Sequence, residues 1–193
     1  MQLLSLLDEL RAIGRTGLNF ADNPYDEERY ERILELVSQY YGKTVGVPSE
    51  EIREDMAAEM GQVTPKVGVD AILFDEEGQI LLMKRPESGL WCLPGGAMEI
   101  HESPEEAVVR EAHEETGLSI RPETLLGAYR LEPNSVHPYT TILLPYLCTV
   151  TDGTLQLSHE GEALQYWEVE EVPDWFPKHE EIALEARKQR DDD

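Results

Sequence analysis

The chain has 193 residues, and 40 acidic against 16 basic side chains give it a formal net charge of -24. Its 40% of hydrophobic residues can fill a buried core, which excludes wholesale disorder. A surface of this charge repels phosphate backbones and no basic stripe interrupts it, so duplex nucleic acid is excluded as a partner.

The sequence also bears on location. Its longest apolar stretches are strand-sized, short of the about 18 residues that a bilayer requires, so we expect no membrane segment. Charged residues interrupt the leucine-rich N-terminus and no basic flank precedes it, which argues against a signal peptide. Two cysteines, Cys92 and Cys148, cannot build a disulfide framework, and we therefore expect a cytoplasmic protein.

The N-terminal third of the chain has the pattern of helices. Apolar residues recur at helical spacing over 3–13. Asn23 and Pro24 then supply an N-cap and a first-turn proline for a second amphipathic helix, which we expect to end at Gly42. A third helix is predicted over 49–60. Because an isolated helical hairpin buries little, this region should dock on the rest of the chain or on a second subunit.

The apolar period changes after Pro65. Alternation over 67–73, a short turn and the apolar run 80–83 predict two strands that pair with each other. Pro145 lacks an N–H, so the strand that contains it should be an edge strand or carry a bulge there. Further strands are predicted over 90–93, 125–131, 139–150 and 164–169.

One strong helix lies among these strands. Ser103 is the expected N-cap, Pro104 opens the first turn, Glu106 completes a capping box and Gly117 ends the helix. A last helix is predicted over 179–189. Strands on both sides of a central helix predict a mixed α/β or α+β sandwich.

The central helix carries three carboxylates, Glu111, Glu114 and Glu115, on one face. Like charges so placed repel, and a hard cation such as Mg²⁺ would turn the repulsion into coordination because it prefers carboxylate oxygens. The glycines Gly95 and Gly96 precede the helix, and a backbone without side chains can approach an ion or a phosphate closely. The acidic excess thus has two interpretations, a solvated surface adapted to high salt and a metal site.

The residues from Gly96 to Leu118 follow a distinctive spacing. Gly96 is followed after five residues by Glu102, and after seven more by Arg-Glu-Ala-His-Glu-Glu-Thr-Gly-Leu over 110–118. This pattern resembles the signature box of the Nudix hydrolases. The family usually has a bulky aliphatic residue where Ala112 stands, a difference that concerns packing under the helix.

The resemblance extends beyond the box. Residues 67–84 and 91–96 are similar to the family's usual approach to it. The stretches 17–20, 24–30 and 64–67 are similar to a dimeric bacterial subgroup with CDP-choline-type pyrophosphatase activity. The resemblance implies a Nudix-type α/β/α sandwich with a mixed sheet over 63–193. It also implies a helical region over 1–62 for dimerisation or for covering the substrate.

The resemblance implies a hydrolase that cleaves the pyrophosphate bond of a nucleoside diphosphate linked to another moiety, such as CDP-choline or ADP-ribose, with Mg²⁺ or Mn²⁺. Glu114 and Glu115 correspond to metal ligands, and Glu111 to a further ligand or the base that activates water. The backbone carbonyl of Gly95 or Gly96 would complete the metal site, and both glycines would contact substrate.

Four other residues receive supporting roles from the resemblance. Arg110 would orient the glutamates, and Glu102 stands at the position of a supporting or outer metal contact. Relatives often draw a further acid from a late loop, where Glu160 and Glu162 are the two choices here.

Three classes of function remain open. They are a metal-dependent pyrophosphohydrolase, including one that removes damaged nucleoside triphosphates, a nucleotide-binding or regulatory module without turnover, and an isoprenoid diphosphate isomerase. The complete set of box carboxylates favours the first. The expected partners are a small nucleotide substrate and a second copy of the chain.

Overall fold

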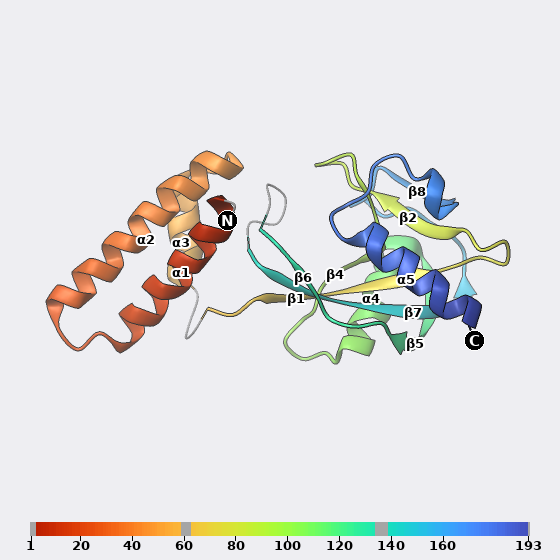
Figure 1. Ribbon diagram of the computed structural model, residues 1–193, viewed down its shortest axis with the longest axis horizontal. Coiled ribbons are helices and arrows are strands. Elements are labelled where there is room, and N and C mark those ends of the chain that lie inside the picture. Colours follow the sequence, from red (N-terminus) through yellow and green to blue (C-terminus); the bar gives the residue numbers. More distant parts are fainter. Residues whose placement is uncertain (1–2, 59–62, 134–138, 193) are drawn as a thin grey trace. The chain divides into compact units, whose positions relative to one another are not determined.

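The computed structural model describes residues 3–58, 63–133 and 139–192. The chain forms two compact units (Figure 1). The first comprises Met1–Lys66 together with Glu132–Thr141, and the second comprises Val67–Leu131 with Ile142–Asp193. We call them the helical unit and the α/β unit. Within the described ranges, no helix combines the length and the apolar character needed to cross a membrane.

The helical unit contains α1 (Leu3–Phe20), α2 (Pro24–Val45) and α3 (Ser49–Ala58). As predicted, Asn23 caps α2, its side chain accepting a hydrogen bond from the N–H of Asp26. The predicted end at Gly42 is wrong, because α2 continues to Val45. Gly46, in the left-handed conformation with φ 76°, ends it and donates its N–H to the carbonyl of Gly42.

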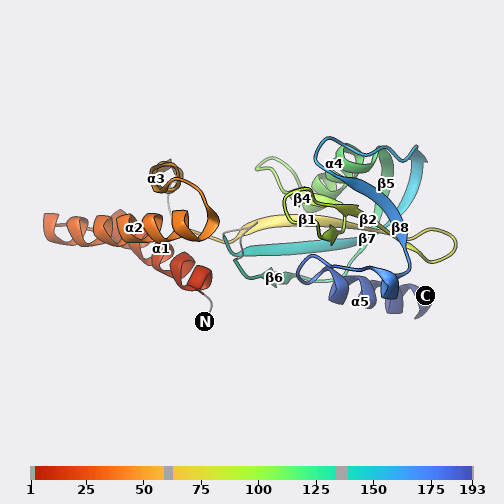
Figure 2. The same cartoon turned by 90° about the horizontal axis from the view of Figure 1, so that it is seen from above.

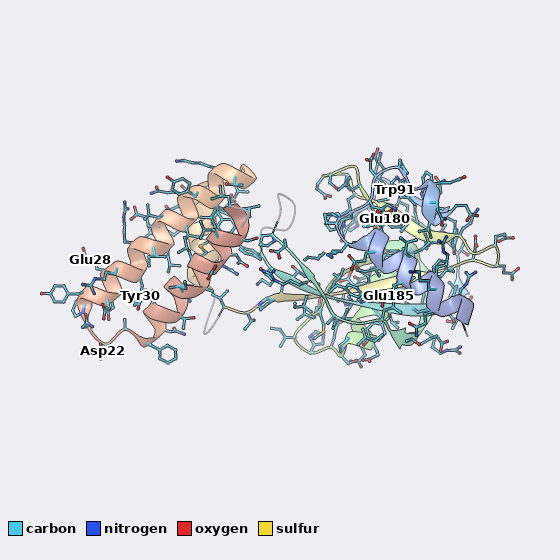
Figure 3. All side chains as sticks on the ribbon, viewed as in Figure 1. Asp22, Glu28, Tyr30, Trp91, Glu180 and Glu185 are labelled. Carbon is cyan, nitrogen blue, oxygen red and sulfur yellow. The ribbon has the colours of Figure 1, made fainter. Side chains whose placement is uncertain are left out.

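Close helix packing holds this unit together. The ring of Tyr30 on α2, labelled in Figure 3, packs against α1 at Gly17. A Cβ at Gly17 would lie 2.2 Å from that ring. The core draws on all three helices, with the buried residues Leu4, Leu7, Val37, Tyr41, Ile52 and Met56.

A segment from later in the chain completes the helical unit. The carboxylate of Asp8 accepts hydrogen bonds from the backbone N–H of Thr140 at 3.0 Å and from its hydroxyl at 2.6 Å. Arg11, only 1% exposed, pairs with Asp8 and stacks over the Tyr139 ring at 4.2 Å. No pattern in the sequence indicated that these residues belong with the N-terminal helices.

The α/β unit consists of two sheets and two long helices. One sheet has the strand order β4-β1-β7-β5, with β6 also paired to β7, and the smaller one has the order β3-β2-β8. The elements are β1 (Lys66–Leu73), β2 (Ile80–Lys84), β3 (Trp91–Cys92), β4 (Gly95–Ala97), α4 (Pro104–Thr116), β5 (Leu118–Leu125), β6 (Tyr129–Leu131), β7 (Thr141–Gly153), β8 (Ala163–Trp167), the 3₁₀ helix η1 (Val169–Glu171) and α5 (His179–Asp192).

Figure 2 shows α4 on one side of β1 and β7 and α5 on the other. This arrangement confirms the predicted α/β/α sandwich. Ala112 of α4 is fully buried in the core beneath the helix, so the small side chain at this position fits close packing. The core brings together residues of β1, β2, α4, β5 and β7, namely Val69, Ala71, Leu73, Leu81, Ala107, Val108, Ala112, Leu118, Ile120, Tyr146 and Cys148.

Two strand predictions are wrong. The segments 67–73 and 80–83 are strands, but they lie in different sheets, and an isolated bridge pairs Phe74 with Ile80 beside the turn between them. The segment 125–131 is not one strand, because it holds the end of β5, a loop and the short β6. Most of β5 was missed because polar residues and a proline interrupt its apolar pattern.

Pro145 does not lie in an edge strand, since β7 runs between β1 and β5. The register shifts between β5 and β7 lie elsewhere, next to Ile120 and Thr124. Pro145 stands one residue beyond the last pair, Leu125 with Tyr146, and its carbonyl accepts the N–H of Leu126. The missing N–H therefore falls where the ladder between β5 and β7 has already ended.

Candidate active site

Helix α4 presents the box carboxylates in a fixed orientation. The hydroxyl of Ser103 accepts the N–H of Glu106, and the carboxylate of Glu106 accepts the N–H of Ser103, which completes the predicted capping box. Gly117, with φ 72°, ends the helix as predicted. With both ends fixed, the spacing of the glutamates places them on the face of α4 that meets the Gly95–Gly96 segment.

Arg110 gathers three of these carboxylates. Its guanidinium forms a bidentate pair with Glu102 at 2.5 and 2.8 Å, and donates to Glu111 at 2.8 Å and to Glu114 at 3.2 Å. It also donates to the carbonyl of Ala97 at 3.2 Å. The bonds from Arg110 lower the pKa of Glu102 to about 2. One cation thus offsets the repulsion that the sequence predicts on this face.

Glu115 lies apart from Arg110. It is 3% exposed, and its carboxylate accepts the N–H of Gly95 at 2.6 Å. Burial raises the pKa of Glu115 to about 7 and also raises that of Glu111. The negative charge of Glu111 raises the pKa of Glu115 further.

The two glycines are required by close contacts. A Cβ on Gly95 would lie 2.1 Å from the carbonyl oxygen of Val69, and a Cβ on Gly96 would lie 2.6 Å from a carboxylate oxygen of Glu111. Gly95 therefore packs against β1, and Gly96 packs against Glu111 of α4.

The two late-loop glutamates differ in their surroundings. Glu160 is close enough to Glu111 and Glu115 for its charge to raise the pKa of both. Glu162 instead forms an ion pair with Lys84 at 3.0 Å. Of the two, Glu160 is the one whose charge acts on the box carboxylates.

The oxygen atoms gathered here are the kind that hold a hard divalent cation. Across the part of the chain that the structure describes, no three acidic, histidine or cysteine side chains already stand in ligating geometry. The reason lies in the contacts above, because Arg110 engages Glu111 and Glu114 while the backbone of Gly95 engages Glu115. The donor set suits a divalent cation, because the carboxylates of Glu111 and Glu115 lie against the glycine backbone of residues 95 and 96, where negative charge is in excess.

Sequence reasoning missed three residues around Gly95. Arg85 donates to the carbonyl of Gly95 at 3.4 Å, and buried Asp70 lies against the same glycine. His179 of α5 binds the neighbouring backbone at Leu93. A charged residue inside the apolar segment 67–73 was the available signal for Asp70; nothing in the local pattern marked the other two.

Comparisons with known proteins identify the family. A family model described as the NUDIX domain matches residues 64–192, and one described as a UDP-X-like, N-terminal oligomerisation domain matches residues 1–56. YjhB of Bacillus subtilis (strain 168), named as a candidate ADP-ribose pyrophosphatase, is 33% identical over 177 residues, 91% of this chain and 85% of its own. An ADP-ribose pyrophosphatase of Methanocaldococcus jannaschii is 36% identical over 61% of this chain and 70% of its own.

The crystal structure of a UDP-X diphosphatase is similar over 97% of this chain and 94% of its own, with a TM-score of 0.59 and 27% identity. The chain therefore belongs to the Nudix family, and its N-terminal region to the kind found in UDP-X-like members. It is a Nudix pyrophosphohydrolase, the class of enzyme that the box residues indicated.

Proposed function

We propose that this enzyme cleaves the pyrophosphate bond of a nucleoside diphosphate linked to a second moiety, using Mg²⁺ or Mn²⁺. The observation that carries the proposal is the convergence of Glu102, Glu111 and Glu114 on Arg110, beside Glu115 on the backbone of Gly95. UDP-linked compounds are the first substrates to test, because the UDP-X diphosphatase resembles both units of the chain. ADP-ribose and CDP-choline come next, and relatives named for ADP-ribose support the former.

The proposed cation site consists of Glu111, Glu114, Glu115 and the carbonyl of Gly95. A divalent ion bound there supplies charge neutralisation at the bridging phosphates and a lowered pKa of bound water. The chain's own residues contribute orientation. Arg110 holds Glu102, Glu111 and Glu114 by hydrogen bonds, and the N–H of Gly95 holds Glu115.

Glu111 is the proposed base. Its carboxylate lies against the backbone of Gly96, on the face of α4 that the other box glutamates share. From there it can accept a proton from the attacking water, and Gly95 and Gly96 are the proposed substrate contacts. Glu102 supports Arg110 from the loop before α4, and Glu160 is the proposed late-loop acid, with Glu162 the less favoured choice.

The test is a panel of UDP-, ADP- and CDP-linked compounds and oxidised nucleoside triphosphates, assayed with Mg²⁺, with Mn²⁺ and after chelation. Glu111→Gln should lower kcat by about 10²–10⁴-fold, the usual contribution of a general base. Glu77→Gln removes the same charge from the exposed turn between β1 and β2 and should leave kcat unchanged. Full activity after chelation, or in Glu111→Gln, would refute the assignment.

We also propose that the protein is a cytoplasmic homodimer formed through its helical unit. The family description of residues 1–56 as an oligomerisation domain supports this. Helix α2 exposes three large side chains at spacings that put them on one face, Tyr25, Leu36 and Tyr40. Cys92 and Cys148 are buried free thiols, which supports a reducing compartment.

A further inference from the structure

The segment before α5 extends the small sheet beside the candidate site. The N–H of Trp91 on β3 donates to the carbonyl of Asp174 at 2.9 Å, and the N–H of Phe176 donates to the carbonyl of Trp91 at 2.8 Å. Trp91 and Trp175 form a parallel bridge. Trp91 is labelled in Figure 3. This short ladder leads toward Pro94 and the start of β4 at Gly95.

The ladder ends on a side chain. The N–H of Leu93 donates to Nδ1 of His179 at 3.0 Å, and His179 is 3% exposed. Because Nδ1 accepts this bond, it carries no proton, and the ring proton stands on Nε2. Nε2 faces Oδ2 of buried Asp70 at 3.9 Å, and that oxygen has no hydrogen-bond partner within the described residues.

The backbone around His179 is held in an unusual conformation. Lys178, the residue before it, has φ 74°, and it is the only non-glycine residue with positive φ in the described part of the chain. Such a conformation is unfavourable for a side-chain-bearing residue and persists where the surroundings demand it. The ring of Phe176 packs edge-on against the imidazole, with centroids 5.1 Å apart. Both features fix the direction of the His179 side chain.

The bonds continue from Leu93 into the site. The carbonyl of Pro94 accepts the N–H of Ala71 at 2.8 Å, and the N–H of the next residue, Gly95, holds Glu115. An apolar side chain in place of His179 would fill the same space but leave the N–H of Leu93 buried without its acceptor. Packing alone therefore does not account for a histidine here.

We propose that His179 is a positioning residue for the pyrophosphatase, acting through the backbone of residues 93–96 on Gly95 and Glu115. Its imidazole replaces the strand carbonyl that would otherwise accept the N–H of Leu93. Helix α5 thereby fixes the segment 93–96, which faces the box helix α4. The kinetic part of this inference rests on the proposed function, whereas the structural part does not.

The test compares three full-length variants. His179→Leu removes the acceptor, and His179→Asn keeps an acceptor oxygen near the position of Nδ1. Arg187→Ala is the control on the same helix, because it removes the ion pair of α5 with Glu170, whereas the bond between His179 and Leu93 does not involve Arg187. Hydrogen–deuterium exchange is followed at residues 91–96 and, for reference, in β2.

In His179→Leu, exchange at 93–96 should accelerate about tenfold more than exchange in β2, whereas Arg187→Ala should affect both regions alike. The kcat of His179→Leu should fall about 10–100-fold, as for other groups that orient ligands, with KM little changed. His179→Asn should restore both readouts toward the wild type.

Exchange of 93–96 in step with β2 in His179→Leu would overturn the proposal, and so would an Asn variant no better than Leu. If the wild type hydrolyses nothing in the panel, the proposed function fails by itself. The exchange comparison then still decides whether His179 holds residues 93–96 in place.

Discussion

At the scale of single residues, the site depends on how negative charge is distributed between two environments. Arg110 holds Glu102, Glu111 and Glu114 by ion pairs, while Glu115 is buried and bonded to a backbone N–H. The first group can be found from sequence because its members lie on or next to one helix. Only the fold shows that the fourth carboxylate is secluded from the others.

The two late-loop glutamates give a test at this scale. We expect Glu160→Gln to lower kcat, since the charge of Glu160 acts on both Glu111 and Glu115. Glu162→Gln should leave kcat nearly unchanged, because Glu162 pairs with Lys84 on the surface. Steady-state kinetics of both variants on the best substrate make the comparison. A larger loss in Glu162→Gln would reverse the assignment.

The residues that sequence reasoning missed have one physical feature in common. Asp70, Arg85 and His179 reach Gly95 or its neighbours only through tertiary packing, from two strands or their ends and from the last helix. The box residues are close in sequence and carry their spacing with them. Contacts between segments that are distant in the sequence leave no regular spacing in it, so these contacts could not be predicted.

At the scale of elements, local signals predicted helices better than strand partners. The caps at Asn23, Ser103 and Gly117 act within a single turn and were confirmed. Strand pairing depends on distant segments, which is why the expected pair 67–73 and 80–83 separates into two sheets. The prediction at Gly42 was wrong because this glycine does not end the helix. A Cβ at Gly42 would lie 2.6 Å from the carbonyl oxygen of Val47, so the glycine lets the chain after α2 pass close to the helix.

The capping box gives the prediction for this scale. Ser103→Ala should lower the free energy of unfolding by about 1 kcal/mol, because the N–H of Glu106 loses its acceptor. Ser103→Asp keeps an acceptor at the same position and should stay close to the wild type. Urea unfolding followed by circular dichroism measures both. Equal losses in the two variants would contradict a capping role.

At the scale of the whole molecule, the helical unit is the proposed source of the dimer. We expect a sedimentation mass near twice 21.9 kDa. Leu36→Asp combined with Tyr40→Asp should give monomers, because two charges would then be buried in an apolar contact. Leu125→Asp, an equally exposed apolar site on β5, should leave the dimer intact. A monomeric wild type would refute the proposal.

The net charge of -24 makes a second prediction for the whole molecule. The box and the late loop account for only a few of the 40 acidic residues, so most of the excess repels itself on the surface. Salt screens such repulsion, and we expect the melting temperature of the metal-free protein to rise from low to molar KCl. A melting temperature independent of salt would count against adaptation to a saline environment.

The segment 132–141 gives the chain an uncommon covalent topology. The polypeptide passes between the units three times, at Lys66–Val67, Leu131–Glu132 and Thr141–Ile142, rather than through a single tether. Proteolytic cleavage between α3 and β1 would therefore not release the helices, because Asp8 and Arg11 would still contact Thr140 and Tyr139. Deleting the N-terminal helices would conversely remove the partners of Tyr139 and Thr140, which belong to the same helical unit, so a truncated enzyme is no fair substitute for the intact one.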